Sequence, residues 1–178
     1  MIPNGPKGLR DSAERERRLA RLREPHIAPL TAYVTRLRAL RGGGESVPWF
    51  DPAGGGVHAR VLLLLESPGP MATSQALENK KRRGSGFISP DNDDESAKNA
   101  YEARDAGGLR PDELVCWNVV PWYLGDGNVK APRTAEIEEA LPFLSELLEL
   151  LPRLEVVVTM GRKAQRGWSL YVKRWETR

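Results

Sequence analysis

The sequence predicts an α/β protein: a three-layer α/β/α sandwich built around a largely parallel central sheet. Three short apolar runs, at 61–65, 114–117 and 156–158, have the composition of buried strands. Stretches with helical periodicity separate these runs, and strands that alternate with helices are typical of a parallel sheet. With 178 residues, the chain is long enough to bury a substantial core, so we expect one domain over 1–178.

Two helices are expected before the first strand. Residues 1–10 are rich in Pro and Gly, and we expect them to be flexible. Asp11 or Ser12 can cap a helix that continues to about residue 23, because Pro25 breaks the pattern there. Apolar residues at helical spacing then predict a second helix over 26–41.

The first strand, Val61–Leu65, is the clearest element of the sequence. Five consecutive aliphatic residues bounded by turn residues are typical of a strand that is buried on both faces. The flanking segments 47–56 and 71–93 are expected to be loops. The second of these is long, and long loops inside a compact domain are usually functional or disordered. Asp93 or Asp94 then caps a helix that ends near residue 105.

The second half of the chain alternates strands and helices. A strand over 114–117 is followed by a helix that Thr134 opens, in which Pro142 predicts a bend or a restart. The strand over 156–158 is followed by Gly161, which opens the last helix.

Composition excludes several classes of protein. The single cysteine, Cys116, excludes an internal disulfide and a four-cysteine metal or iron–sulfur site, and two histidines make a histidine-rich metal site improbable. We therefore expect neither a metal nor another cofactor. There is neither an apolar run of membrane-spanning length nor an N-terminal signal core, so we expect no membrane contact and a cytoplasmic location.

The charge permits a polyanionic partner without requiring one. Lys and Arg number 27 against 24 for Asp and Glu, which gives a net charge of +3. The densest basic cluster lies inside the long loop, and it is positioned to hold phosphates near a site on that side of the sheet. It consists of Lys80, Lys81, Arg82 and Arg83.

Each predicted strand is followed by a chemically distinctive residue. Glu66 follows the first, Asn118 the second, and Gly161 the third. Because parallel strands end at the same edge of a sheet, these residues are expected to share one pocket. An amide matches the N3–H and O4 edge of uracil, a carboxylate can position or deprotonate water, and Phe87 on the long loop can stack on a base.

Each of these residues also has a purely structural explanation. Asn118 can satisfy loop backbone, Phe87 can fill the core, and the basic cluster can be a solvated run. For Gly161, a tight strand-to-helix turn is the explanation that we favour. An unrelated α/β enzyme that binds phosphate at 161–164 is the last-ranked alternative, because the chain has no glycine-rich phosphate loop.

Together these motifs resemble the uracil-DNA glycosylase superfamily from about residue 48 to residue 168. Leu65-Glu66-Ser67-Pro68-Gly69 is similar to the first active-site motif of the family, and Gly86-Phe87 is similar to the loop whose Phe stacks on uracil. Asn118 is similar to the Asn that reads the uracil edge. The segment from Val156 to Ala164 is similar to the family's strand followed by Gly-x-x-Ala at a helix start.

The resemblance implies hydrolysis of the N-glycosidic bond of uracil in single- or double-stranded DNA, for base excision repair. Glu66 would position the water or stabilise the cationic sugar, Phe87 would stack, and Asn118 would bind uracil. Ser67, Pro68, Gly69 and Gly161 would complete the substrate pocket. The expected phosphate contacts are Lys80, Lys81, Arg82, Arg83, Arg162 and Lys163.

One family motif is absent from the sequence. No His-Pro-Ser segment is present, and neither His26 nor His58 precedes a proline. That His stabilises the charge on the leaving uracil, so its loss is expected to cost orders of magnitude in rate. The chain is then a truncated relative of an active enzyme, a degenerate DNA- or nucleotide-binding member, or an enzyme that uses other donors such as backbone N–H groups. We expect a monomer, with self-association if a missing terminal strand exposes a sheet edge.

Overall fold

The central sheet of the protein has three parallel strands in the order β4-β2-β5. The computed structural model describes residues 6–42, 44–73, 84–125 and 130–175. Leu65 at the end of β2 lies opposite Asn118 at the end of β4, and Leu64 lies opposite Thr159 at the end of β5. All three strands therefore finish at one edge of the sheet. Their bounds are Val61–Leu65 (β2), Leu114–Asn118 (β4) and Val156–Thr159 (β5).

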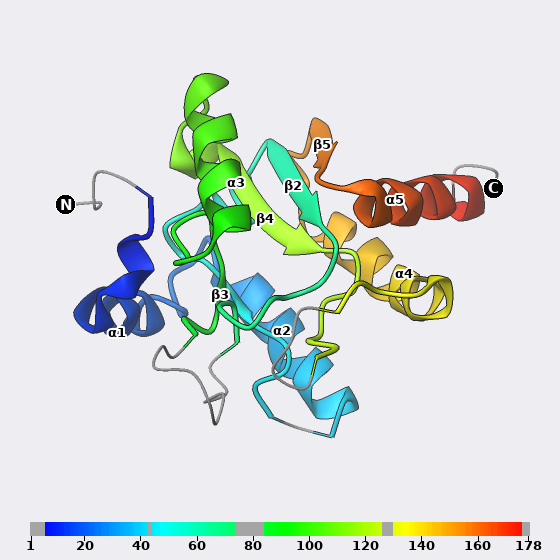
Figure 1. Ribbon diagram of the computed structural model, residues 1–178, viewed down its shortest axis with the longest axis horizontal. Coiled ribbons are helices and arrows are strands. Elements are labelled where there is room, and N and C mark those ends of the chain that lie inside the picture. The colour runs from blue at the N-terminus through cyan, green and yellow to red at the C-terminus, as the bar shows by residue number, and fades with distance from the viewer. Residues whose placement is uncertain (1–5, 43, 74–83, 126–129, 176–178) are drawn as a thin grey trace.

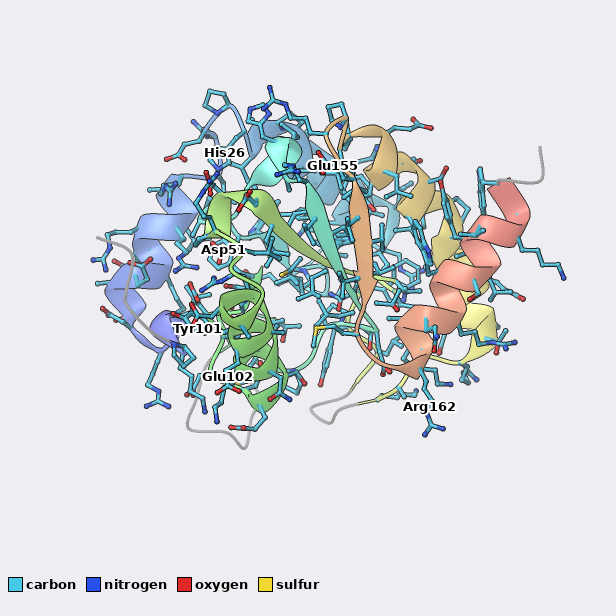
Figure 2. All side chains as sticks on the ribbon, turned by 90° about the horizontal axis from the view of Figure 1, so that it is seen from above. His26, Asp51, Tyr101, Glu102, Glu155 and Arg162 are labelled. Carbon is cyan, nitrogen blue, oxygen red and sulfur yellow. The ribbon has the colours of Figure 1, made fainter. Side chains whose placement is uncertain are left out.

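Helices cover both faces of this sheet, so the predicted α/β fold is confirmed. The two views place α3 on one face and α2 and α4 on the other, with α5 beside α4 at the β5 side (Figure 1, Figure 2). The helices are α1 (Ser12–Ala20), α2 (Ala28–Leu40), α3 (Glu95–Ala106), α4 (Thr134–Glu149) and α5 (Arg162–Trp175), and single 3₁₀ turns span Gly8–Arg10, Gly56–His58 and Pro111–Glu113.

The helix starts follow from local side-chain chemistry. The carboxylate of Asp11 accepts the N–H of Ala13 at 2.9 Å, and that of Asp94 accepts the N–H of Ala97 at 2.9 Å. Each carboxylate satisfies a backbone donor that the first helical turn leaves unpaired. Pro142 lies inside α4, which nevertheless continues without interruption from Thr134 to Glu149.

A second, two-stranded parallel sheet lies where the sequence predicted only loops. β1 (Trp49–Phe50) pairs with β3 (Phe87–Ile88). Two-residue strands show no periodicity in a sequence, so pattern analysis does not detect them. The Phe50 ring stacks on Trp117 of β4 with 3.8 Å between the ring centroids, which joins this small sheet to the main core.

The N-terminal segment packs on the domain over the part that is described. Within the stretch that was expected to be flexible, Gly8–Arg10 form a 3₁₀ turn, and the Leu9 side chain is buried. The Leu9 N–H donates to the carbonyl of Asp91 at 3.0 Å. Residues 7–10 are thus fixed to the segment that precedes α3.

β5 forms one edge of the main sheet within the described residues. It pairs with β2 only, and Val156 and Val158 are 49% and 43% exposed. An apolar edge strand of this kind favours pairing with another chain, and the self-association expected from the sequence stays a prediction. A search of the described helices found none with the length and apolar character needed to cross a bilayer.

Candidate active site

A cavity of about 680 Å³ opens at the edge where the three strands end. Its walls come from the turn after β2, the end of β4, the turn before α5, the segment after β3 and the start of α3. Six of the predicted site residues line it: Glu66, Ser67, Pro68, Gly69, Asn118 and Gly161. The shared edge of the parallel sheet therefore brings these residues together, as the order of strands and motifs predicted.

Glu66 stands on a rigid part of the backbone. Its carbonyl accepts the N–H of Val120 at 3.0 Å, and the carbonyl of Leu65 accepts the N–H of Val119 at 2.9 Å. The Glu66 carboxylate lies at the start of α5, where the N–H of Lys163 donates to it at 3.4 Å. A helix N-terminus favours a negative charge, so this position suits an ionised carboxylate facing the cavity.

Gly161 makes room for that carboxylate. Its φ is +90°, a conformation that residues with a side chain rarely adopt. A Cβ at this position would lie 2.7 Å from Oε1 of Glu66, which is closer than real contacts allow. The backbone conformation therefore favours glycine, whereas a Cβ here would force the Glu66 carboxylate to shift, and only the first effect could be anticipated from the sequence.

Asn118 lines the cavity and carries a buried donor that has no partner among the described residues. The side chain is only 2% exposed, and in the described part of the chain its Nδ2 has no hydrogen-bond partner. Leaving a buried N–H donor unpaired costs about 1–3 kcal/mol, so buried donors are nearly always satisfied. A ligand that offers an acceptor at this point would supply the missing bond.

The ring of Phe87 is not brought to the cavity in this structure. Phe87 is fully buried in β3 and is absent from the cavity lining, whereas the next residue, Ile88, lines it. Successive residues of a strand point to opposite sides, so only one of this pair can face the cavity. Stacking of Phe87 on a base stays a prediction.

The predicted phosphate contacts fall into two groups. Lys80, Lys81, Arg82 and Arg83 lie outside the described residues. Arg162 is exposed at the start of α5 and points away from the domain, and Lys163 is half-buried (Figure 2).

Sequence reasoning missed the part of the cavity wall that follows β3. Ser89, Pro90 and Asn92 follow β3 and line the cavity. Asn92 is buried, accepts the hydroxyl of Ser85 and donates through Nδ2 to the carbonyl of Phe87 at 2.8 Å. The Ser-Pro-Asp-Asn sequence at 89–92 is rich in residues that bond to nearby backbone, and this was the available signal.

The two histidines lie away from this cavity. His26 contacts the carbonyl of Pro52 through Nε2 at 3.1 Å, and neither His26 nor His58 is among the lining residues. Over the described ranges, no group of three or more His, Cys, Asp or Glu side chains is arranged to hold a metal ion.

Comparison with known families gives a match that spans the residues of this cavity. The family model described as "Uracil DNA glycosylase superfamily" matches residues 52–176, which include every described residue of the cavity. No curated protein matches the chain. Since the matched region covers well over half of the sequence and carries the whole β4-β2-β5 sheet, the chain belongs to the uracil DNA glycosylase superfamily.

Proposed function

We propose that this protein hydrolyses the N-glycosidic bond of uracil, a deaminated base, in DNA and so begins base excision repair. The observation that carries the proposal is the buried Nδ2 of Asn118, which has no partner among the described residues and belongs to a residue that lines the same cavity as Glu66. A buried polar group without a partner is a candidate for binding a ligand. The superfamily match supports DNA as the substrate class.

The reaction requires the target base to leave the duplex, because its glycosidic bond is otherwise inaccessible. The Asn118 amide would then hold the flipped base, with Nδ2 donating to a uracil carbonyl oxygen. As the bond between C1′ and N1 breaks, its electron pair moves to the uracil, and the Asn118 donor stabilises the negative charge that develops there.

The Glu66 carboxylate would act on the sugar side of the same bond. The sugar becomes cationic as the bond breaks, and a nearby carboxylate stabilises that charge and orients a water molecule. The water oxygen forms the new bond to C1′, its proton is accepted by the carboxylate or by solvent, and the uracil anion is protonated after departure. Glu66 and Asn118 thus act on opposite partners of the breaking bond.

The cationic face of α5 supports the contact with DNA. The exposed side chains of Arg162 and Arg166 are one helical turn apart, and neither forms an ion pair within the described residues. The helix carries no acidic residue, and it starts at the cavity beside Glu66. A DNA strand whose base enters the cavity would place its phosphates beside this helix.

A non-catalytic relative that binds uracil-containing DNA is the second candidate. One observation favours it: no histidine is found among the described residues that line the cavity. Without a cationic or strongly donating group at the leaving base, binding would persist while the chemical step slowed. Both candidates predict preferential binding of DNA that contains uracil. Only the enzyme would also release the base.

The decisive experiment is uracil release from a labelled oligonucleotide with one uracil, in single-stranded and double-stranded form. We expect release of free uracil and an abasic product, with none from the matched thymine oligonucleotide. A folded sample that shows no release at protein concentrations above that of the DNA would contradict the enzymatic proposal. Preferential binding of the uracil oligonucleotide without release would then establish the non-catalytic candidate.

DNA binding through α5 predicts a specific salt dependence. Replacing Arg162 and Arg166 with Gln should reduce the slope of log affinity against log salt concentration by about 2, since each phosphate contact contributes about one unit. Titrations of a thymine oligonucleotide at several salt concentrations measure this slope. Arg153→Gln, an exposed position before β5 and therefore at the opposite end of the sheet, is the matched control. Equal slopes for all three proteins would show that α5 does not contact the backbone of DNA.

A further inference from the structure

The N-terminal residues hold the acidic segment Asp91–Glu95, which precedes and begins α3. Four residues make these contacts, and we call them the N-terminal clasp: Lys7, Leu9, Arg10 and Arg18. All four lie before residue 52, where the family match begins. The family resemblance therefore says nothing about their role, which has to be inferred from the contacts.

Arg18 is the buried centre of the clasp. Its side chain is 1% exposed, although α1 otherwise carries mostly charged surface residues. The guanidinium donates to Asp91 at 2.6 Å and to Glu14 at 2.8 Å, and it also pairs with the carboxylate of Asp51. Figure 2 shows Asp51 between α1 and the main sheet. One cation thus joins α1, the residue after β1 and the segment after β3.

The outer contacts extend the same attachment toward α3. Arg10 binds Asp93 through two nitrogens at 3.1 and 2.8 Å, and Lys7 reaches Glu95 at 3.2 Å. Leu9 donates its backbone N–H to the carbonyl of Asp91 at 3.0 Å. Exposed ion pairs contribute little each, whereas a buried, multiply bonded guanidinium fixes geometry. Arg18 is therefore the member whose removal should matter most.

The segment that Arg18 holds is a wall of the candidate active site. Ser89 and Pro90 line the cavity that contains Glu66 and Asn118. The Ser89 hydroxyl donates to the Asp51 carboxylate and accepts the N–H of Asp91 at 3.0 Å. Both aspartates that Arg18 bridges, Asp51 and Asp91, are thus bonded to Ser89, which lines the cavity.

The charges make this arrangement dependent on Arg18. Burial and the nearby Asp51 carboxylate raise the pKa of Asp91 above its ordinary value, and the Arg18 guanidinium opposes this effect. Removing one member of a buried ion pair leaves the other charge uncompensated, which is more disruptive than removing the whole pair. Without Arg18, the carboxylates of Asp51 and Asp91 would have no guanidinium between them. Their repulsion would displace the segment 88–91, which forms the cavity wall.

We propose that Arg18 is a positioning residue of the active site. Residues 7–18 precede the matched family region, yet they hold the segment that forms one wall of the cavity. The proposal rests on the proposed function for its effect on uracil release. Its structural part, that Arg18 fixes the cavity wall at 88–91, is independent of any activity.

Arg18→Met tests the proposal, because it keeps most of the side-chain volume and removes the charge. We expect amide hydrogen exchange at 88–94 to rise about tenfold or more while the β2 and β4 amides keep their protection. We expect kcat/KM for uracil release to fall about 10- to 100-fold at a temperature where the variant is fully folded, since small displacements at a site have effects of that size.

A charge-balanced variant separates positioning from stability. Arg18→Met combined with Asp91→Asn removes one of the two facing carboxylate charges and leaves that of Asp51, so we expect the melting temperature to recover in large part while local exchange and slow uracil release persist. Recovery of all three would show that Arg18 only stabilises the fold. Arg23→Gln, an exposed arginine just beyond the end of α1 with no ion pair among the described residues, is the matched control and should change none of the measurements.

Failure of this inference is distinguishable from failure of the proposed function. If the unmodified protein releases no uracil, the function fails, and the exchange measurement still tests whether Arg18 holds the wall. If the unmodified protein is active and Arg18→Met loosens 88–94 with unchanged kcat/KM, the positioning role is refuted. Unchanged exchange in Arg18→Met refutes it as well.

Discussion

Replacing Asn118 with Ala is expected to reduce uracil release by about 100- to 1,000-fold, the usual cost of removing one preorganised donor from the site where negative charge develops. Asn118 ends β4 and lines the cavity, and its buried Nδ2 has no protein partner among the described residues. Single-turnover kinetics with a uracil oligonucleotide measure the chemical step directly. Affinity for a thymine oligonucleotide should be unchanged, because that base does not need to enter the cavity.

The same variant should retain its stability. Losing a hydrogen-bonded amide from a protein interior is destabilising, but the donor of Asn118 has no partner among the described residues. Its removal therefore relieves a cost of about 1–3 kcal/mol and offsets the loss of packing. We therefore expect a melting temperature close to that of the unmodified protein. A large drop in melting temperature together with unchanged release would mean that Asn118 is a structural amide.

Replacing Glu66 with Gln is expected to slow uracil release by about 100- to 10,000-fold, the range associated with a positioned acid–base or charge-stabilising group. Gln keeps the size of the side chain and can still accept the N–H of Lys163, so the fold should be preserved. The neutral amide can neither stabilise a cationic sugar nor accept a proton from water. Release rates for Glu66→Gln and the unmodified protein, on the same uracil oligonucleotide, provide the measurement.

Gly161→Ala is expected to displace the Glu66 carboxylate while leaving its chemical identity unaltered. The added Cβ would meet Oε1 of Glu66 at 2.7 Å, so we expect uracil release to fall together with a stability loss of about 1–3 kcal/mol from the unfavourable φ. Gly44→Ala is the matched control, because Gly44 has φ +92° and nothing near its Cβ position. If both variants lose stability and keep full activity, the position of the Glu66 carboxylate is not critical and the role assigned to it is wrong.

The sequence alone determined the features that depend on local chemistry and on strand order. Val61–Leu65 was delimited as a strand because a run of aliphatics ends abruptly at a carboxylate and a proline turn. Asp11 and Asp94 were each one of two neighbouring candidate caps, because a helix start needs an acceptor within a few residues, and the structure selected them over Ser12 and Asp93. The convergence of Glu66, Asn118 and Gly161 followed from one rule, that parallel strands end at a common edge.

Only the tertiary structure decided which side chains face the cavity. The pairing of β1 with β3 buries Phe87 and turns Ile88 to the cavity, and two-residue strands leave no pattern from which to predict this. The close approach of Gly161 to Glu66 depends on how α5 is docked beyond β5, which the sequence does not specify. A role that is assigned to a residue by family resemblance, such as stacking by Phe87, can therefore be judged only once the structure shows whether that residue lines the cavity.

The clasp around Arg18 was decided by tertiary structure alone. Arg18 meets Asp51 and Asp91, which are 33 and 73 residues away in the chain, and in the sequence it is one arginine among many on a polar helix. Helix caps and strand runs are short-range features, so a sequence displays them directly. A buried ion network is created by the packing of distant segments, and its partners become recognisable only when burial removes the water that would otherwise solvate each charge.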